Sequence, residues 1–304
     1  MYKVAVLMSV YSPNMIFLKE QVKSIVNQKY RTDLVIRIDG IFNSELKVYL
    51  SSLTMQYKNV KVVFGDNLGA QGSFLELLKI TQGSYDLYAF ADQDDVFTSD
   101  KISRAVEMIE DNNVPQLYCS RLFYINKNNV KLGKSKDLNN IGFGFKNILA
   151  ENHIGGNCMV FNNSLCDLVL YSYGVKPIMH DWWVLLLASA FGKVVYDRKP
   201  CVLYRQHEMN LIGGTSSVFE HYINKIKNFS FDQSRNSIYA QSKLFSDYYM
   251  SNLDVDKQAV LKSFLDSKLS LNNRLKYLFS KDKVKRLSTL DNFILNILII
   301  INKY

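Results

Sequence analysis

Three carboxylates crowd into four residues at Asp92, Asp94 and Asp95, within the stretch ADQDDV. Acids this close repel one another, so a fold keeps them together where solvent or a bound cation offsets their charge. Oxygen-rich turns of this kind suit divalent cations. An EF-hand is excluded, because Val96 occupies the next ligand position and Phe97 stands where that loop requires glycine. Two interpretations stay open for the turn itself, a cation site and a solvated loop.

The acidic turn is expected to follow a buried strand and to precede a helix. Residues 87–91 are an uncharged apolar run, and apolar residues recur at helical spacing over 102–109. Ser99 is the expected N-cap of that helix, with Asp100 in its first turn. Ligands of open α/β sheets bind just beyond the carboxyl ends of the strands, so the turn lies where a ligand site is expected.

Strand and helix alternate along the first hundred residues, which predicts a parallel sheet with right-handed crossovers and helices on both faces. The turn after the first strand, YSPN, contains no glycine, so the dinucleotide fingerprint is missing. Gly65 is followed five residues later by Ala70 and no lysine, so a P-loop is excluded too. Strands are expected at residues 3–10, 34–39, 60–64 and 87–91, and helices at 17–26, 46–53 and 74–80.

The composition, 48% hydrophobic and 21% charged over 304 residues, is that of a globular protein with a sizeable core. The cysteines lack C-x-x-C spacing and are expected as buried free thiols of a reducing cytoplasm. The N-terminal stretch turns polar too early for a signal peptide. No run approaches the roughly 20 apolar residues that span a bilayer, so a soluble or peripheral protein is expected. The cysteines are Cys119, Cys158, Cys166 and Cys201.

The net charge of +9 lies mostly in the C-terminal region. Residues 221–304 hold 14 Lys and Arg against 7 Asp and Glu, whereas the first 220 residues hold 23 against 21. A basic, helical region points to an anionic partner surface, and no nucleic-acid-binding motif accompanies it. Two interpretations stay open: attachment to a membrane surface, helped by the apolar residues 293–301, or packing on the rest of the chain or on a second subunit in a homodimer.

Seven blocks resemble the family 2 glycosyltransferases with the GT-A fold, in the family's order over about residues 1–215. They are VAVLMSVYSP, VIRIDG, DNLGAQGSF, ADQDDVF with DKI, HIGGNCMVFN, HDWWVLLLASAFGKVVYD and YRQHEMNLIGG. The combination of ADQDDV, HDWW and YRQH is most similar to the branch that includes bacterial rhamnosyltransferases. The resemblance implies a GT-A catalytic domain over residues 1–217, with a nucleotide-sugar half at about 1–100 and an acceptor half at about 101–217. A basic helical region, 218–304, follows.

The resemblance also implies a donor site. Asp39 is expected to accept a hydrogen bond from the imide N–H of a pyrimidine base, although one acid precedes Gly40 where family members often have two. Asp92 and Asp94 match the D-x-D motif. Asp94 is the implied direct ligand of Mg²⁺ or Mn²⁺, a Lewis acid for the leaving diphosphate, and Asp92 is expected to face the ribose or a metal-bound water. The remaining donor-side residues are Ser9, Tyr11, Asn67 and Gly69 at the nucleotide, Arg205 at the phosphates and His207 as a second metal ligand.

On the acceptor side, Asp181 matches the family acid near the start of a helix and is the expected general base. An ordinary Asp pKa near ~3.9 leaves it ionised at neutral pH, and a base opposite the leaving group implies inversion. The residues alone also allow Asp181 to be a helix N-cap and Asp95 to cap the helix after the acidic turn. The other expected acceptor-side residues are Asp95, His153, Gly155, Gly156 and Trp182.

The function implied is an inverting, metal-dependent glycosyltransferase that moves L-rhamnose from dTDP-L-rhamnose to a lipid-linked saccharide. Its expected place is bacterial surface polysaccharide synthesis, peripheral on the inner face of the plasma membrane. A UDP-hexose is the alternative donor, in O-antigen or capsule synthesis, because Asp39 can pair with uracil or thymine. Two other classes stay open: a non-catalytic nucleotide-binding scaffold, which would not need an acid at Asp181, and a nucleotide-sugar hydrolase, which would release free sugar.

Overall fold

The computed structural model describes residues 1–110, 113–138, 142–206 and 237–304. The chain divides into two compact units. The first unit comprises Met1–Asn139, Ile154–Tyr173 and Gly192–Gly213; the second comprises Asn140–His153, Gly174–Phe191 and Gly214–Tyr304. The domain boundary predicted at residue 217 lies outside the described residues and stays a prediction.

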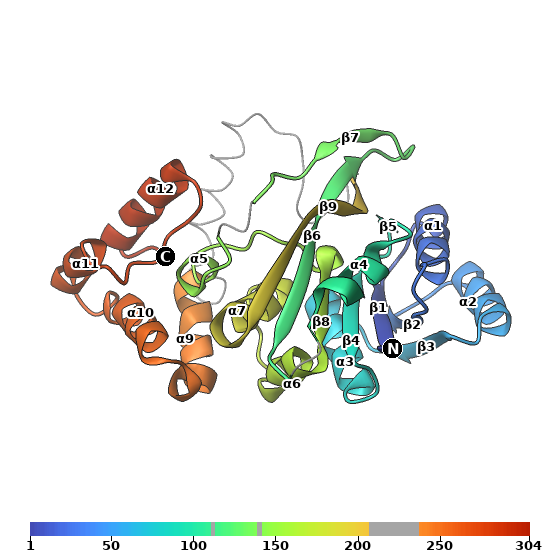
Figure 1. The fold of residues 1–304 in the computed structure, drawn as a ribbon, viewed down its shortest axis with the longest axis horizontal. Helices are drawn as coiled ribbons and strands as arrows, with labels where there is room; N and C mark the ends of the chain where they lie inside the picture. The colour runs from blue at the N-terminus through green and yellow to red at the C-terminus, as the bar shows by residue number, and fades with distance from the viewer. Residues whose placement is uncertain (111–112, 139–141, 207–236) are drawn as a thin grey trace. The chain divides into compact units, whose positions relative to one another are not determined.

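In the part of the chain that the structure describes, the first unit contains one nine-stranded sheet (Figure 1). Its strand order is β3-β2-β1-β4-β8-β6-β9-β5, with β7 paired to β6. The strands are β1 Val4–Val10, β2 Asp33–Asp39, β3 Val60–Gly65, β4 Leu87–Ala91, β5 Val96–Phe97, β6 Gln116–Ile125, β7 Lys131–Lys134, β8 Met159–Asn162 and β9 Lys193–Arg205. The predicted parallel strands are confirmed in β1 to β4, and β6 is parallel to β9, whereas β8 runs antiparallel to both β4 and β6.

The helices of the first unit lie on both faces of this sheet, as the alternation predicts. The chain steps in one direction from β1 to β3 and then reverses to reach β4, so right-handed crossovers place α1 and α2 opposite α3. The reversal makes β1 and β4 neighbours at the switch point of the sheet. The helices are α1 Met15–Val26, α2 Ser44–Gln56, α3 Gly69–Thr81, α4 Lys101–Met108 and α6 Asn163–Tyr171, with the 3-10 turn η1 Gly156–Cys158.

Side-chain caps fix where several of these helices begin. Asn14 accepts hydrogen bonds from Ile16 N–H and Phe17 N–H at the start of α1. The prediction of Ser99 as the N-cap of α4 is wrong, because that helix begins at Lys101 with Asp100 at the N-cap position. Asp100 provides no side-chain cap, since its carboxylate binds the Lys199 ammonium of β9.

The second unit is helical in its described residues and packs around aromatic side chains. Trp183 lies edge-on to Phe245, with ring centroids 5.8 Å apart, and Lys257 Nζ donates to the Ala190 carbonyl at 2.7 Å. No helix among those described is long and apolar enough to cross a membrane. The helices are α5 Phe145–Ile148, α7 His180–Phe191, α9 Ile238–Tyr249, α10 Val255–Asp266, α11 Leu271–Leu278 and α12 Thr289–Ile300, with the 3-10 turn η2 Met250–Asn252.

The prediction that the cysteines are buried free thiols is confirmed. Burial raises the pKa of the Cys158 thiol to about 12 and that of Cys166 to about 12. Both groups therefore stay protonated at neutral pH and act as small apolar side chains.

Candidate functional site

The carboxyl ends of β1 to β4 gather most of the predicted donor residues at one edge of the sheet. Ser9 is paired in register with Arg37, and Asp39 with Gly65. The acidic turn directly follows β4, whose last residue, Ala91, pairs with Met8 of β1. The structure thus brings residues from four separate sequence blocks to the switch point, as the resemblance predicts. They are Ser9, Tyr11, Asp39, Asn67, Gly69, Asp92 and Asp94.

The acidic turn distributes its three carboxylates between surface and interior. Asp92 and Asp94 are half-buried, whereas Asp95 is 1% exposed. The backbone of the turn is held from two directions: Gln21 Nε2 donates to the Asp92 carbonyl at 3.1 Å, and Arg205 Nε donates to the Asp94 carbonyl at 2.8 Å. The positions of the two half-buried acids are therefore set by hydrogen bonds to their own peptide groups.

Gln93, which the sequence analysis did not single out, joins the acidic turn to the loop after β1. The Tyr11 N–H donates to Gln93 Oε1 at 2.9 Å, and Gln93 Nε2 donates to the Tyr11 carbonyl at 3.0 Å. A side-chain amide that bonds both the N–H and the C=O of one residue fixes two loops relative to each other. Its position between Asp92 and Asp94 was the available signal.

Asp95 stabilises the acidic turn from its buried side. Its Oδ1 accepts the Arg205 N–H at 3.0 Å, and its Oδ2 accepts a hydrogen bond from Asn157 Nδ2. Burial and the neighbouring Asp94 charge raise the pKa of Asp95 to about 7. It does not cap α4, because Asp100 holds that position. Its predicted contact with an acceptor stays a prediction.

A buried lysine completes this cluster. The Lys101 ammonium donates to the Asn157 carbonyl and lies 3.3 Å from the centroid of the Phe97 ring. Burial lowers the pKa of Lys101 to about 7. Lys101 belongs to the DKI part of the matching block, but lysines are so often exposed that its type gave no sign of burial.

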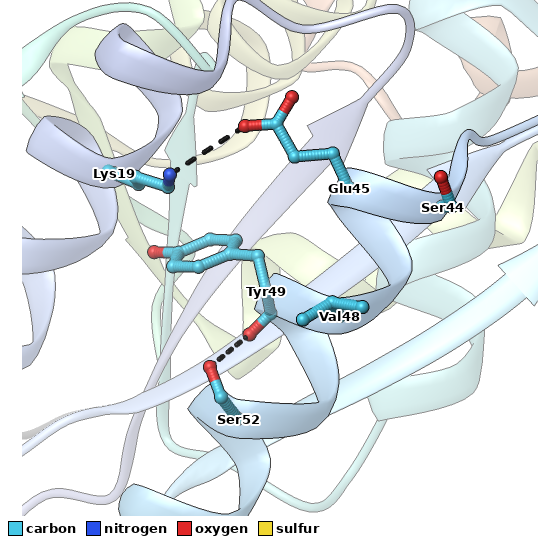
Figure 2. Close-up of a pocket in the computed structure, with 6 residues that line it drawn as sticks. All are labelled: Lys19, Ser44, Glu45, Val48, Tyr49 and Ser52. Carbon is cyan, nitrogen blue, oxygen red and sulfur yellow. Dashed lines mark hydrogen bonds and ion pairs between the residues drawn. The ribbon is translucent and has the colours of Figure 1, made fainter.

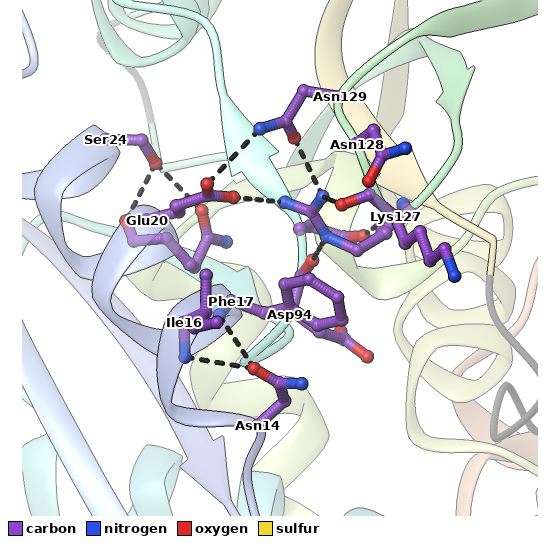
Figure 3. A network of polar contacts seen from close by, with 12 residues as sticks. Asn14, Ile16, Phe17, Glu20, Ser24, Asp94, Lys127, Asn128 and Asn129 are labelled. Carbon is purple, nitrogen blue, oxygen red and sulfur yellow. Dashed lines mark hydrogen bonds and ion pairs between the residues drawn. The ribbon is translucent and has the colours of Figure 1, made fainter.

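Arg205 joins the acidic turn, α1 and the β6–β7 hairpin in one polar network. Figure 3 labels its partners Asp94, Glu20 and Asn129. Its Nη2 donates to Glu20 Oε2 at 2.6 Å and its Nη1 to Asn129 Oδ1 at 2.7 Å. The guanidinium carbon lies 4.2 Å from the centroid of the Phe17 ring, and the side chain is 0% exposed. The predicted contact with the phosphates stays a prediction; in this structure Arg205 orients the carbonyl of Asp94.

Asp39 is held by a second buried arginine. Arg37 Nη1 donates to Asp39 Oδ1, and the Leu68 N–H donates to the same oxygen at 2.8 Å. Among the described residues, no hydrogen bond reaches Oδ2. A side chain at Gly65 would place Cβ 2.6 Å from Arg37 Nη2 and would displace the guanidinium that binds Asp39. The arrangement aligns the Asp39 carboxylate at the end of β2.

Ser9 shares this support, since its hydroxyl donates to Ser73 Oγ at 2.7 Å and Ser73 in turn accepts from Arg37 at 3.1 Å. Asn67 and Gly69 form the start of α3, where the Gly69 N–H donates to Asn67 Oδ1 at 3.0 Å. Gly69 has φ +70° and open space around it, so only its backbone conformation demands glycine. The end of β1 and the start of α3 therefore both lie at the edge of the sheet where Asp39 lies.

The acidic turn fits the kind of cation site that a nucleotide diphosphate completes. Described residues include no group of three His, Cys, Asp or Glu side chains placed to hold a metal ion. Mg²⁺ is commonly held by one or two protein carboxylates together with substrate phosphate oxygens. Asp92 and Asp94 supply such a pair on one turn. His207, the other predicted ligand, lies outside the described residues.

Asp181 belongs to the second unit and lies in the first turn of α7, which begins at His180. It is 7% exposed, and its Oδ1 accepts from the Trp182 N–H at 2.6 Å and from Asn152 Nδ2 at 3.3 Å. An acid in the first helical turn interacts favourably with the positive end of the helix dipole. Burial lowers the pKa of the adjacent His180.

The two tryptophans of the HDWW block have different surroundings. Trp182 is half-buried and its Nε1 donates to the Ile148 carbonyl at 2.6 Å, whereas Trp183 is 1% exposed in the aromatic core. Trp182 is thus the more exposed member of the pair, and its predicted contact with an acceptor stays a prediction. His153 lies in the second unit, and Gly155 and Gly156 lie in the first, at the start of η1.

A shallow hollow of about 470 Å³ lies elsewhere in the first unit, between α1 and α2 (Figure 2). Lys19 spans it, with Nζ 3.8 Å from Glu45 Oε1 and 5.6 Å from the centroid of the Tyr49 ring. None of the six lining residues is a predicted site residue. The hollow therefore shares no lining residue with the predicted donor site.

The comparisons with known proteins agree with this arrangement. The family model for glycosyl transferase family 2 matches residues 15–167, and the chain belongs to that family. It is therefore a glycosyltransferase. Over 223 residues it is 26% identical to the dTDP-rhamnosyl transferase RfbG of Shigella flexneri, a match that covers 68% of this chain and 74% of RfbG.

Two solved structures show the same fold. TarS 1–349 of S. aureus has a TM-score of 0.57 at 15% identity and covers 99% of this chain and 80% of its own. The mannosyltransferase PcManGT of Pyrobaculum calidifontis, solved with GDP-Man and Mn²⁺, has a TM-score of 0.51 at 10% identity and covers 99% and 87%. The predicted GT-A fold, a mixed α/β sheet followed by C-terminal helices, is confirmed.

Proposed function

We propose that this glycosyltransferase moves L-rhamnose from dTDP-L-rhamnose to a saccharide acceptor with inversion at the anomeric carbon. The observation that carries the chemistry is the acidic turn at the switch point, held beside the β1 loop by Gln93 and aligned with Asp39. Similarity to RfbG, named a dTDP-rhamnosyl transferase, supports the choice of donor.

Donor recognition is proposed to divide between Asp39 and the acidic turn. Asp39 would accept the imide N–H of thymine through Oδ2, because Arg37 and the Leu68 N–H both bind Oδ1. The glycine-containing loop at Asn67 and Gly69 would pass close to the nucleotide. A divalent cation held by Asp94, with Asp92 and His207 nearby in the proposed site, would neutralise the charge that develops on the departing diphosphate.

Asp181 is the proposed general base. The acceptor hydroxyl attacks the anomeric carbon, its proton passes to the Asp181 carboxylate, and the bond from that carbon to the diphosphate oxygen breaks. Asn152 and the Trp182 N–H both bind Oδ1 of Asp181 and hold the carboxylate in one orientation. Asp95, His153, Gly155, Gly156 and Trp182 are the proposed acceptor-side residues.

The proposed acceptor is a lipid-linked saccharide of a bacterial surface polysaccharide, with the enzyme peripheral on the inner face of the plasma membrane. The basic C-terminal region supports this location, because anionic lipids attract clustered lysines and arginines.

The test is a donor panel. Purified protein is incubated with dTDP-L-rhamnose, dTDP-glucose, UDP-glucose or UDP-GlcNAc, each with Mn²⁺ or Mg²⁺ and again with chelator, and released nucleotide diphosphate is measured with and without acceptor. Acceptor-dependent release from dTDP-L-rhamnose alone, abolished in Asp94→Asn, is the expected result. Preference for a UDP sugar would replace the donor; release without acceptor would indicate a hydrolase.

A further inference from the structure

The helix α12 carries apolar side chains on two opposite sides. Its buried side consists of Asp291, Leu295 and Ile299, which are spaced four residues apart. At 3.6 residues per turn, the exposed apolar residues fall within an arc of about 100° on the far side. We call this set the α12 stripe: Leu290 at 50% exposure, Phe293 at 62%, Ile297 at 41%, Ile300 at 40% and Ile301 at 52%.

The neighbouring helix α11 repeats the pattern. Leu271, Leu275 and Phe279 are exposed at 52%, 42% and 90%, and they lie four residues apart on the side opposite the buried Tyr277. The two helices pack on each other within the second unit (Figure 1). Two adjacent helices that each turn an apolar stripe outward are unusual for a surface that faces only water.

The region of α11 and α12 is packed and held by hydrogen bonds. The Val284 N–H donates to Tyr277 Oη at 2.8 Å, and the Arg286 N–H donates to Asn292 Oδ1 at 2.7 Å, which closes the connection between α11 and α12. Tyr304 is 3% exposed, and its hydroxyl lies 2.6 Å from Ser267 Oγ. The stripes are thus held in place by the buried sides of the same helices.

The positive charge of the region around the two stripes indicates the kind of partner that they contact. Residues 268–304 contain eight Lys and Arg but two Asp and Glu. Lys276, Lys281, Lys285 and Lys303 are exposed around the stripes. Bulky apolar residues bordered by lysines match the boundary between the headgroups and acyl chains of an anionic bilayer.

We propose that the α12 stripe together with Leu271, Leu275 and Phe279, which we call the α11–α12 face, inserts shallowly into an anionic lipid surface and docks the enzyme there. The proposal gives the membrane location suggested above a defined face, and it rests on the proposed function only in supposing a lipid-linked acceptor. Binding to vesicles needs neither donor nor acceptor, so the docking face and the transfer reaction can fail independently.

The test is co-sedimentation of the full chain with vesicles of phosphatidylcholine alone or of phosphatidylcholine mixed with phosphatidylglycerol. We expect binding to the mixed vesicles, at least tenfold weaker in the double variant Phe293→Ser/Ile297→Ser because two apolar side chains leave the lipid. Lys276→Gln/Lys281→Gln should weaken it about thirtyfold, or roughly fivefold for each lysine. Met55→Ser/Val255→Ser removes two more exposed apolar residues outside the face, at 86% and 80% exposure, and should bind normally.

Absence of binding to either vesicle, or equal loss in the control variant, would overturn the proposal. Light scattering after gel filtration tests the alternative that the face binds a second copy of the chain. A wild-type dimer that becomes a monomer in Phe293→Ser/Ile297→Ser would support that alternative. Because all substituted positions are exposed, unchanged melting temperatures are expected and provide the folding control.

Discussion

Arg205 shows how a buried cation can hold the acidic turn in place through the backbone of that turn. Its three donor groups bind Glu20, Asn129 and the carbonyl of Asp94, and its own N–H binds Asp95. A guanidinium has a fixed fork of donors, so the peptide group of Asp94 is fixed with it. At this scale the site depends on geometry supplied from β9, which lies 111 residues later in the chain.

Replacement of Arg205 by lysine should therefore impair the turn while it keeps the charge. A single ammonium cannot bind Asp94, Asn129 and Glu20 together, and hydrogen bonds to charged groups are worth about 1.5–3 kcal/mol each. We expect kcat/KM to fall about 10- to 150-fold, with an increased metal requirement, in steady-state kinetics at several metal concentrations.

Arg198→Lys is the matched control, because Arg198 is 66% exposed and pairs with Asp137 on the surface. Wild-type metal dependence in a folded Arg205→Lys variant would show that the turn does not need the fork. A larger loss in Arg205→Met than in Arg205→Lys would separate the contribution of charge from that of geometry.

Asp181→Asn should remove the proton acceptor and leave the donor site intact. General-base catalysis contributes about 10²- to 10⁴-fold, so transfer should fall by that factor. Stabilisation by dTDP with metal, measured by thermal shift, should be unchanged. Asp256→Asn, an exposed acid of α10 in the same unit, is the control. Loss of nucleotide binding in Asp181→Asn would contradict the role of base.

Residue types and spacing placed Asp39, Asp92 and Asp94 at the donor edge, because the ends of parallel strands share that edge. The residues that hold these carboxylates in place, Arg37 and Gln93, could not be predicted in the same way. Arg37 reads as an ordinary strand residue, and Gln93 as a turn residue. Their roles depend on partners that the fold supplies: Gln93 meets Tyr11 from 82 residues away.

At the scale of elements, α4 is tied to the sheet by a buried acid of β9. Asp197 accepts Arg104 Nε at 2.6 Å and Arg104 Nη2 at 2.9 Å, and the Tyr118 hydroxyl at 2.8 Å. Burial opposes the ionisation of Asp197, but the hydrogen bonds from Arg104, the Lys199 N–H and Tyr118 prevail and lower its pKa below the usual range.

A lowered folded-state pKa means that this contact stabilises the protein above the unfolded-state value of about 4 and is lost as the pH falls through the folded-state value. Arg104→Gln should therefore cost about 1.5–3 kcal/mol in urea unfolding at pH 7 and much less at pH 3. Arg198→Gln, whose pair is exposed, should change little at either pH. An equal cost of Arg104→Gln at both pH values would refute the linkage.

The elements themselves were predictable to the extent that local pattern determines them. The strand at 87–91 and the first three helices have strong apolar periodicity, and all are present. The short strands β5, β7 and β8 were not predicted, because pairing with distant strands stabilises them and their own sequences do not. The N-cap of α4 was misplaced for a similar reason, since Lys199 determines where the Asp100 carboxylate points.

At the scale of the whole molecule, donor binding should protect one unit selectively. A nucleotide present at about a hundred times its dissociation constant stabilises the folded state that binds it by roughly 2.7 kcal/mol. We expect dTDP with metal to slow amide hydrogen exchange in β1, β2, β4 and the acidic turn, and Asp94→Asn to abolish the effect. Slower exchange confined to α9–α12 would show that the nucleotide binds the second unit, which would contradict the proposed donor site.

The order in which the two units appear along the chain has a consequence for synthesis. The chain passes between the units five times, after residues 139, 153, 173, 191 and 213. A ribosome that adds about 5 to 20 residues per second therefore releases α7 several seconds before the helices that bury its apolar side chains. During that interval Trp183 lacks Phe245 and Tyr249 of α9, the aromatic side chains that it packs against in the folded unit. Chaperone dependence during translation, more than instability of the finished enzyme, should limit its yield in a heterologous host.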